Sequence, residues 1–517
     1  MTTKSETKKD ANLKDYAFLS TSLLTAVFRG FLVGIIVGLV VGSFRWLIEQ
    51  GLGFVRSLYQ LAHQQPIWLF FMFAIYSVIA LVLAFLMKRE PEIKGSGIPQ
   101  VEAELKGLLP SSWWAILWRK FIGGVLAIAS GLMLGREGPS IQLGAMVGKG
   151  IACWSRLSQV EERTLLASGA AAGIATAFNA PIAGLLFVVE EVYHHFSRLV
   201  WVSALTACLT ANVISLRMFG ETPVLQMPTN LPHLPLEDYW HFILLGALLG
   251  GLGWVYEKVI LFSPQVYTWL GKKLHLSSNL YSIIAFLAIL PIGYYLPQLL
   301  GGGNSLIISL PHLNIGVGLL LVYFVLRFIF SMISYASGLP GGIFLPILTL
   351  GALLGSAYGQ FMVNMGIVSQ ASLPLFLILG MSGYFGAISK APLTAIVLVC
   401  EMVGDLQSLM GLGVVTLTAY VVMDLLKGVP IYEAMLERSY QMERDDNQTT
   451  LIQIPVSEKL AGKRIADIKL PADVLIVNQR HQDTSQLVTG QTILRLGETI
   501  DVAIKTKDLA KIRELLL

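Results

Sequence analysis

The chain has 517 residues, of which 54% are hydrophobic and only 14% are charged. Because an ordinary soluble domain contains about 25% charged residues, this composition predicts a membrane protein. The formal net charge of +4 is too small, in a chain of this length, to indicate a nucleic-acid partner.

Residues 1–20 are polar, and we expect them to form a tail before the first apolar helix. The tail contains Lys4, Lys8, Lys9 and Lys14. Positive charge beside the first span favours the cytoplasmic side, and the first apolar run is too long for a cleavable signal peptide. We therefore predict a multi-pass protein of the cell membrane (inner or plasma membrane) with both termini in the cytoplasm.

Ten apolar stretches are long enough to cross the roughly 30 Å hydrocarbon core of a bilayer as helices. They are residues 24–47, 66–87, 113–134, 165–189, 199–219, 239–262, 280–300, 313–336, 345–366 and 409–426. We therefore predict an all-α polytopic membrane protein. The cysteines lack metal-binding spacing, and we interpret all three as small buried apolar residues: Cys153, Cys208 and Cys400. We expect no metal and no cofactor.

The membrane region repeats itself. Residues 131–148 align with residues 338–355 at a constant offset of 207, and the identical pairs include Gly131/Gly338, Gly135/Gly342, Pro139/Pro346, Gly144/Gly351 and Gly148/Gly355. Residues 169–190 align with residues 380–401 at an offset of 211, and the identical pairs include Pro181/Pro392 and Glu190/Glu401. Two ordered matches with nearly equal offsets predict a duplication.

The duplication divides the membrane region into one repeat over residues 21–220 and a second over residues 235–437. Apolar segments that glycine and proline interrupt at corresponding positions of two halves are typical of transporters whose site lies at the repeat interface. Two glycine-rich helix starts facing each other there would direct backbone N–H groups and positive dipole ends at one point, which favours an anion. The repeat alone leaves open whether the halves are parallel or inverted.

Glu137 lies among glycines and a proline between two apolar segments. An ionisable group at membrane depth costs about 2.5 to 3.5 kcal/mol even on lenient scales, so it is a functional-site hypothesis by default. The repeat places Phe344 at the corresponding position of the second half. The alternative is an ion pair with Arg136, although adjacent helix residues point in different directions.

The composition changes after Tyr432, and residues 437–446 are dense in charge. Apolar and polar residues then alternate, which predicts short strands and a final amphipathic helix. We expect the strands around residues 474–477, 492–496 and 500–504 and the helix near residues 509–516. Residues 450–517 are therefore predicted to form a small cytosolic α+β domain.

Four motifs together resemble the CLC family of chloride channels and chloride/proton antiporters. They are GSGIP at 95–99, GREGP at 135–139, GGIFLP at 341–346 and a tyrosine in PIY at 430–432. The resemblance covers nearly the whole membrane region. It implies an inverted repeat with broken and re-entrant helices, and a homodimer in which each subunit holds its own anion pathway.

The resemblance implies that the Ser96 hydroxyl and the Tyr432 phenol bind a central anion from two sides. Backbone N–H groups around Ile343 and Phe344 and beside Gly138 would complete the coordination. Such dipoles replace hydration without a full positive charge, so the anion can leave again. Read without the family, Ser96 is equally well a helix cap and Tyr432 an interfacial anchor.

Glu137 matches the family's gating glutamate, which competes with chloride when ionised and carries a proton from the outer side. Glu191 matches the internal proton glutamate that family exchangers have and family channels generally replace. Its neighbour Glu190 corresponds to Glu401 in the repeat, and we expect a structural role for it. Without the family, Glu190, Glu191, His194 and His195 are an ordinary polar helix end at the membrane surface.

These matches predict a secondary active chloride/proton antiporter whose partners are chloride, protons, the lipid bilayer and a second subunit. In the family, serine at position 96 accompanies a preference for chloride, and proline accompanies a preference for nitrate. Fluoride exporters depart from several of the motifs. A passive chloride channel of the same fold is the alternative, and Glu191 is the feature against it. Ser/His/Asp or metal-ligand spacing is missing from the membrane motifs, so we do not expect an enzyme.

Residues 460–471 and 492–498 resemble the C-terminal ligand-binding subdomain of RCK/TrkA regulatory proteins. The resemblance implies a cytoplasmic regulatory domain with an unidentified small-molecule ligand, and a passive dimerisation module is the alternative. Such a tail also raises the hypothesis that the membrane part serves a potassium transport system. The chain lacks a TVGYG-like filter, and a cation site would use carbonyl oxygens or acidic rings rather than N–H groups.

Overall fold

The computed structural model describes residues 3–109, 111–193, 197–228, 234–313, 315–439, 449–457, 460–468, 470, 474–481 and 484–505. The chain divides into two compact units, Met1–Leu436 and Glu437–Leu517. The first is helical and contains both predicted repeats, and the second contains a small sheet.

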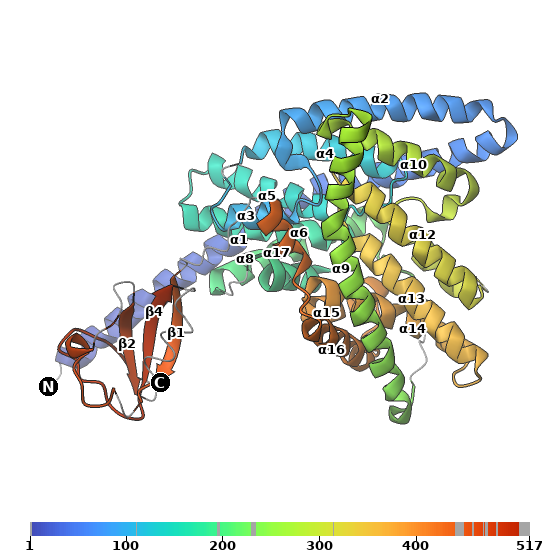
Figure 1. Ribbon diagram of the computed structural model, residues 1–517. Helices are drawn as coiled ribbons and strands as arrows, with labels where there is room; N and C mark the ends of the chain where they lie inside the picture. The colour runs from blue at the N-terminus through green and yellow to red at the C-terminus, as the bar shows by residue number, and fades with distance from the viewer. Residues whose placement is uncertain are drawn as a thin grey trace. The chain divides into compact units, whose positions relative to one another are not determined.

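The first repeat consists of helices of very unequal length (Figure 1). They are α1 (Thr3–Gln64), α2 (Ile67–Arg89), α3 (Ile98–Leu105), α4 (Trp113–Ala129), α5 (Glu137–Trp154), α6 (Gln159–Phe178), α7 (Pro181–Phe187), the π-helix η2 (Val188–Tyr193) and α8 (Arg198–Phe219). The polar segment expected as a tail is helical from Thr3 onward and continuous with α1.

The second repeat has the same succession of long and short helices. They are α9 (Trp240–Leu274), α10 (Ser282–Tyr295), α11 (Asn304–Ser309), α12 (Val317–Ala336), α13 (Phe344–Asn364), α14 (Leu373–Ser389), α15 (Pro392–Val403), α16 (Leu409–Leu425) and α17 (Ile431–Ser439). In both halves the central pair packs closely, α5 on α6 and α13 on α14.

Eight helical stretches in the described part of the chain are long and apolar enough to cross a membrane. They differ from the predicted stretches at four places. Two predicted stretches, residues 113–134 and 409–426, form helices of only 17 residues each, α4 and α16. Residues 165–189 are not one helix, because Asn179 adopts a left-handed conformation (φ 52°) and Pro181 starts a new helix. The prediction also missed residues 370–389, where glycines and serines interrupt the apolar run.

Glycines bring the central helices into backbone contact. A Cβ on Gly144 would overlap the carbonyl oxygen of Gly169, and a Cβ on Gly351 would overlap that of Gly380. Small residues at such positions let membrane helices approach closely enough for extensive van der Waals contact. The same contact occurs in both halves, as the duplication predicted.

Two glycines related by the repeat meet at the centre of this unit. Gly135 and Gly342 donate backbone hydrogen bonds to each other's carbonyl oxygens, both at 2.7 Å, in an isolated antiparallel bridge. Because equivalent residues pair reciprocally, a local two-fold axis relates the halves at this point. The helices that begin just after the bridge, α5 and α13, therefore start close together.

The same symmetry appears in two exchanged helix caps. The Glu190 carboxylate accepts hydrogen bonds from the backbone N–H groups of Leu393 and Thr394, at 3.2 and 2.7 Å, at the start of α15. The Glu401 carboxylate accepts them from Ile182 and Ala183, at 3.1 and 2.8 Å, at the start of α7. Each repeat thus caps a helix of the other, which supports the structural role expected for Glu190.

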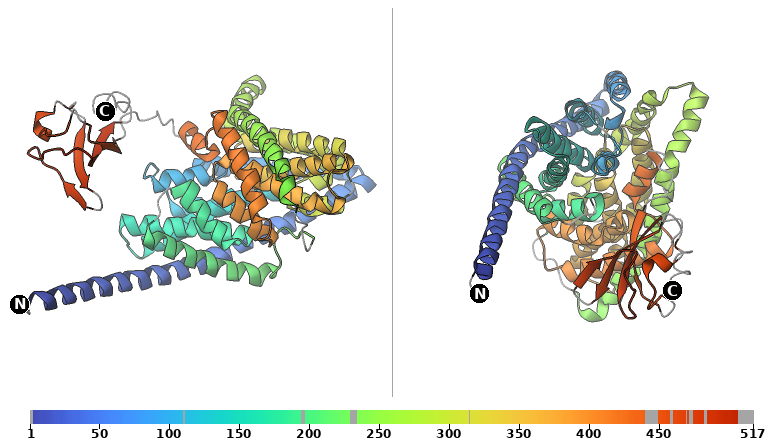
Figure 2. Two further views of the ribbon diagram at one scale, coloured as in Figure 1. Left: turned by 90° about the horizontal axis from the view of Figure 1, so that it is seen from below. Right: turned by 90° about the vertical axis from the view of Figure 1, so that its left-hand side faces the viewer.

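The second unit contains one antiparallel sheet, whose strands are drawn as arrows in Figure 2. The strand order is β1-β4-β2-β3. Its strands are β1 (Thr449–Pro455), β2 (Leu475–His481), β3 (Thr484–Leu487) and β4 (Thr499–Lys505). The sheet has its own buried apolar core, with Ile454, Val474, Ile476, Leu494, Ile500 and Val502 among its members.

The expected strands around residues 474–477 and 500–504 lie in β2 and β4, but the one at 492–496 is wrong. That segment forms only an isolated bridge between Ile493 and Arg464. Gly490 and Gly497 lie on either side of it, and Gly497 has a φ of 81°, so the chain turns before a strand can extend. The predicted helix at 509–516 lies outside the described residues.

Of the cysteines predicted to be buried, Cys208 and Cys400 are, but Cys153 is exposed. Cys153 lies in the last turn of α5, beyond the tightly packed glycine region. The apolar residues next to Cys153 in the sequence gave no sign that this end of α5 lies outside the core.

Candidate functional site

The starts of α5 and α13 form the centre of the candidate site. The first intrahelical backbone bonds run from Ser140 to Arg136 and from Ile347 to Ile343, at 3.0 and 2.9 Å. The N–H groups of the residues before them have no partner within their own helix. Pro139 and Pro346 occupy the same position in the two helices and contribute no N–H group. The N–H groups available at each helix start are therefore those of the residues closest to the Gly135–Gly342 bridge.

Glu137 is the first residue of α5, and its side chain is fully buried. Its Oε2 lies directly over Gly135, where a Cβ would overlap it and would also be 3.2 Å from the Leu345 nitrogen. Neither carboxylate oxygen makes a hydrogen bond of regular geometry within the described part of the chain. The negative group therefore lies at the starts of both helices.

Ser96 lies in a loop that the second repeat holds in place. Gly95 donates to the carbonyl of Gly338 at 3.2 Å and accepts from the N–H of Gly341 at 3.0 Å. The Ser96 side chain is 1% exposed, and its hydroxyl has no hydrogen-bond partner among the described residues. A Cβ at Gly138 would overlap Ser96 Oγ, so the hydroxyl lies against the start of α5.

Tyr432 approaches the same region from α17. It is fully buried, and its phenol oxygen also has no hydrogen-bond partner among the described residues. The Phe187 ring contacts both Tyr432 and Phe344, with ring centroids 6.1 and 5.6 Å apart. The aromatic side of the site is thus built by three helices.

Glu191 is not part of this centre. It lies in the π-helix η2 and is 5% exposed, which does not fit a polar helix end at the surface. Glu102, Glu190 and Glu433 are close enough to interact with it electrostatically. Tyr432 lies within electrostatic range of both Glu191 and Glu137, the two glutamates predicted to carry protons. His194 and His195 lie outside the described residues.

The sequence interpretation missed two buried cations that shape the site. Lys120 Nζ donates to the carbonyls of Ile93 and Gly95, at 2.9 and 2.8 Å. Arg327 donates to the carbonyls of Leu299 and Gly301, both at 2.7 Å. These carbonyls accept hydrogen bonds from the two buried cations, which lowers the high cost of burying a charge.

A signal for both cations was present in the sequence. Lys120 and Arg327 lie in apolar stretches and are 207 residues apart, which is the repeat offset. The loops they hold also correspond: Gly95 and Gly97 have φ of 64° and 96°, and Gly301 and Gly303 have φ of 76° and 114°. Glycine adopts this left-handed region without steric cost.

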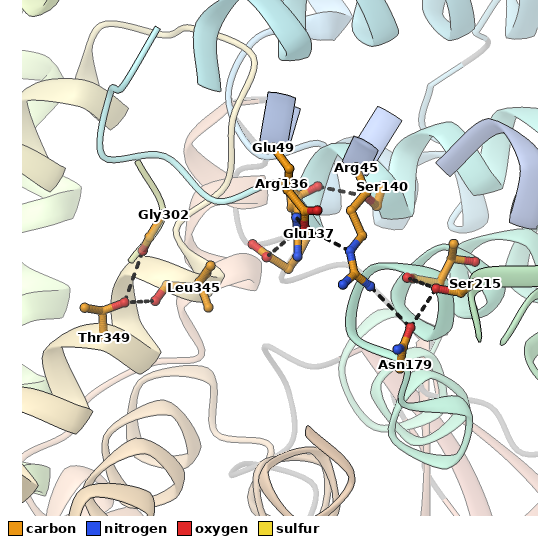
Figure 3. Close-up of polar contacts among 11 residues, drawn as sticks. Arg45, Glu49, Arg136, Glu137, Ser140, Asn179, Ser215, Gly302, Leu345 and Thr349 are labelled. Atoms are coloured by element: carbon orange, nitrogen blue, oxygen red, sulfur yellow. Dashed lines mark hydrogen bonds and ion pairs between the residues drawn. The ribbon is translucent and has the colours of Figure 1, made fainter. Parts of the chain in front are cut away.

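A polar network lies beside Glu137 (Figure 3). Arg136 Nη1 is 2.6 Å from Glu49 Oε1, and Arg45 Nε is 3.1 Å from the same oxygen. Arg45 also donates to Asn179 at 3.2 Å. Arg136 Nε is 4.0 Å from Glu137 Oε1, so the close partner of Arg136 is Glu49 rather than its neighbour.

A search of the described residues finds no group of three or more histidine, cysteine or acidic side chains that could hold a metal ion. The arrangement instead places buried hydroxyl donors, helix-start amides and one carboxylate around a single point. Such donors suit a small anion, and the carboxylate can occupy the same place.

Comparisons with known proteins agree with this geometry. The family model described as voltage gated chloride channel matches residues 79–424, and the one described as TrkA-C domain matches residues 450–517. The H(+)/Cl(-) exchange transporter ClcA of Klebsiella pneumoniae (strain 342) is 34% identical over 443 residues, which cover 84% of this chain and 92% of that protein.

Solved structures share the fold. The crystal structure of a slow cyanobacterial Cl-/H+ antiporter is 30% identical, with a TM-score of 0.75 and coverage of 81% of this chain and 99% of that one. A CLC-type fluoride/proton antiporter is 22% identical, with a TM-score of 0.66 and coverage of 80% and 98%. The chain therefore belongs to the voltage gated chloride channel (CLC) family and has its inverted-repeat fold, as the four motifs predicted.

Proposed function

We propose that this protein is a secondary active antiporter that exchanges chloride for protons across the membrane. The similar transporter of Klebsiella pneumoniae and the cyanobacterial antiporter support this function by their names. The observation that carries it is the position of Glu137, whose buried carboxylate lies where the starts of α5 and α13 favour an anion. One place can then hold either the carboxylate or chloride.

Chloride binds between Ser96 and Tyr432 in this proposal. Both hydroxyls are buried without a partner among the described residues, so an anion would satisfy them. The backbone N–H groups around Ile343 and Phe344 and beside Gly138 supply further donors. Because these donors carry no full charge, chloride is dehydrated without being trapped.

Glu137 couples the two ions. The ionised carboxylate occupies an anion position, and protonation removes its attraction to the helix starts, so that it leaves and chloride enters. Glu191 is the internal proton acceptor, and it lies on η2 rather than at the starts of α5 and α13. Tyr432 lies within electrostatic range of both glutamates.

The same proposal includes a homodimer with a separate pathway in each subunit, in the cell membrane and with both termini in the cytoplasm. Residues 450–517, which match the TrkA-C domain, would then form a cytoplasmic regulatory domain with a small-molecule ligand. A passive chloride channel is the second candidate, and the buried Glu191 favours exchange over it.

Paired flux measurements test the proposal. The purified protein is reconstituted into liposomes, and chloride and proton movements are recorded together under a chloride gradient. We expect protons to move against chloride and to be driven uphill by it. Chloride flux without any proton movement would favour the channel instead.

A further inference from the structure

A cavity of about 240 Å³ lies next to the candidate site but is not used by the proposed mechanism. It is lined by residues of α1 and α4, by the segment before α5, by the loop before α11 and the start of that helix, and by Leu345 of α13. Its polar lining consists mainly of Glu49, Arg56, Arg136, Asn304 and Ser305.

The repeat identifies this cavity as the counterpart of the Ser96 region. Arg327 holds the loop of Gly301 and Gly303 as Lys120 holds that of Gly95 and Gly97, so Gly302 takes the place of Ser96. Leu345, 207 residues after Gly138, takes the place of that glycine.

The second half lacks the hydroxyl that Ser96 supplies in the first, because its counterpart Gly302 has no side chain. Both Gly302 and Leu345 line the cavity. A ligand at this second position must therefore be recognised by other groups.

Two arginines supply donors there. The Arg136 side chain is 7% exposed, and its Nε has no hydrogen-bond partner in the described part of the chain. Arg56 donates to Ser305 Oγ at 2.6 Å, but its Nε is also buried without a hydrogen-bond partner among the described residues. Unsatisfied buried guanidinium donors are costly, and an anion with its water would satisfy them.

The balance of charge also favours an anion. Arg56 and Arg136 line the cavity with one carboxylate, that of Glu49, which already pairs with Arg136 at 2.6 Å. The cavity lining therefore keeps a net positive charge, which Glu49 partly neutralises. Asn304 Oδ1 is buried without a hydrogen-bond partner among the described residues, and turning its amide over would direct N–H groups at the same space.

We propose that this cavity is a second, weaker anion site, in which a chloride ion waits beside Arg136 until Glu137 leaves its position. The site rests on the proposed exchange function, which supplies the ion. Partial neutralisation by Glu49 keeps binding weak enough for release, as a transport pathway requires. Because Arg56 donates to Ser305 rather than to Glu137 or Ser96, it affects entry of the ion rather than coupling.

The first test locates the anion. Crystals of the full-length protein are grown in bromide, which replaces chloride and gives an anomalous signal. We expect a bromide peak in the cavity of the wild-type protein and a loss of that peak in Arg56→Gln. Arg89→Gln, which removes an exposed arginine at the end of α2, is the matched control and keeps the peak. A wild-type cavity without bromide overturns the proposal.

The second test measures transport in planar bilayers while chloride is varied on one side at a time. In Arg56→Gln we expect the chloride concentration for half-maximal flux to rise about tenfold on one side only, because a charge-assisted hydrogen bond contributes about that factor. The maximal flux and the chloride-to-proton ratio stay unchanged. If the chloride concentration for half-maximal flux is the same in Arg56→Gln and the wild type on both sides of the bilayer, the proposed site is contradicted.

A second variant keeps the test decisive if Arg56→Gln does not fold. Asn304→Leu fills the cavity without removing a charge, and we expect it to lose the bromide peak and to raise half-saturation on the same side. Unchanged bromide binding and half-saturation in this variant contradict the proposal. A wild-type protein that moves chloride without protons contradicts the proposed exchange function but not the second anion site. Bromide binding is measured independently of proton movement.

Discussion

At the scale of single residues, Glu137 combines burial with a position that an anion would favour. Its Oε2 lies over Gly135, beside the first amides of α13, and its near neighbour Arg136 pairs with Glu49 instead. The carboxylate is therefore not fixed by a close ion pair and can move, which the proposed exchange with chloride needs. This freedom is what a coupled gate requires.

Replacing Glu137 by alanine should separate the two ions. We expect Glu137→Ala to keep chloride flux, because the helix starts and both hydroxyls remain, and to lose at least nine-tenths of the proton movement. Paired chloride and proton recordings in liposomes measure both. Proton pumping at the wild-type ratio would contradict the role of Glu137.

Glu191 and its neighbour Glu190 offer a matched pair. We expect Glu191→Gln to abolish proton transfer while chloride still moves, because the buried amide cannot carry a proton. Its control is Glu190→Gln, which keeps the coupling ratio. Normal proton movement in Glu191→Gln would remove it from the pathway.

Ser96 determines which anion is preferred in this proposal. In Ser96→Pro the hydroxyl is lost, and the site offers less compensation for dehydration. We therefore expect preference to shift from chloride toward the more easily dehydrated nitrate, measured as the ratio of the two fluxes. A ratio equal to that of the wild type would show that Ser96 does not contact the anion.

At the scale of elements, carboxylates and buried cations fix the short helices and loops around the site. Glu190 caps α15 and Glu401 caps α7, each across the repeat interface. Lys120 and Arg327 each hold a Gly-x-Gly loop by its carbonyls. These contacts align broken helices that could not otherwise satisfy their backbone groups in a bilayer.

The brace formed by Lys120 can be tested directly. Lys120→Met leaves the carbonyl of Ile93 without its donor and the carbonyl of Gly95 with only the Gly341 N–H, and an unsatisfied buried carbonyl costs about 1–3 kcal/mol. We expect a lower unfolding temperature in detergent and weaker chloride binding, because the loop carries Ser96. Lys88→Met, at the exposed end of α2, is the control and should leave both unchanged. Equal behaviour of the two variants would contradict the brace.

At the scale of the whole molecule, the chain consists of a helical transport unit and a sheet domain with separate apolar cores. The two repeats share one core because their central helices meet at the Gly135–Gly342 bridge. The site exists only where both repeats contribute. The C-terminal domain supplies none of the residues proposed to bind chloride or carry protons.

A chain ending at Ser439 should therefore still exchange ions. We expect the same chloride-to-proton ratio in liposomes, with any change confined to the rate, because the missing domain contributes no group to the pathway. Gel filtration in detergent checks that the shortened protein is folded. A folded protein without exchange would mean that the domain is part of the transport machinery.

The sequence alone determined the membrane class and the family, and it predicted the duplication and, through the family's motifs, the roles of Ser96, Glu137, Glu191 and Tyr432. These follow from composition, constant offsets and short motifs, which are local properties of the chain. The break at Asn179 was not visible in this way, because an apolar run has the same hydropathy whether or not one residue turns left-handed.

Only the tertiary structure decided which distant residues meet. The hydrogen bonds of Gly135 with Gly342, of Glu190 with Thr394 and of Arg136 with Glu49 all join segments far apart in the chain. Their formation depends on how whole helices pack, which no local pattern encodes. Lys120 and Arg327 stand at the repeat offset, but packing alone showed that both hold loops at the candidate site.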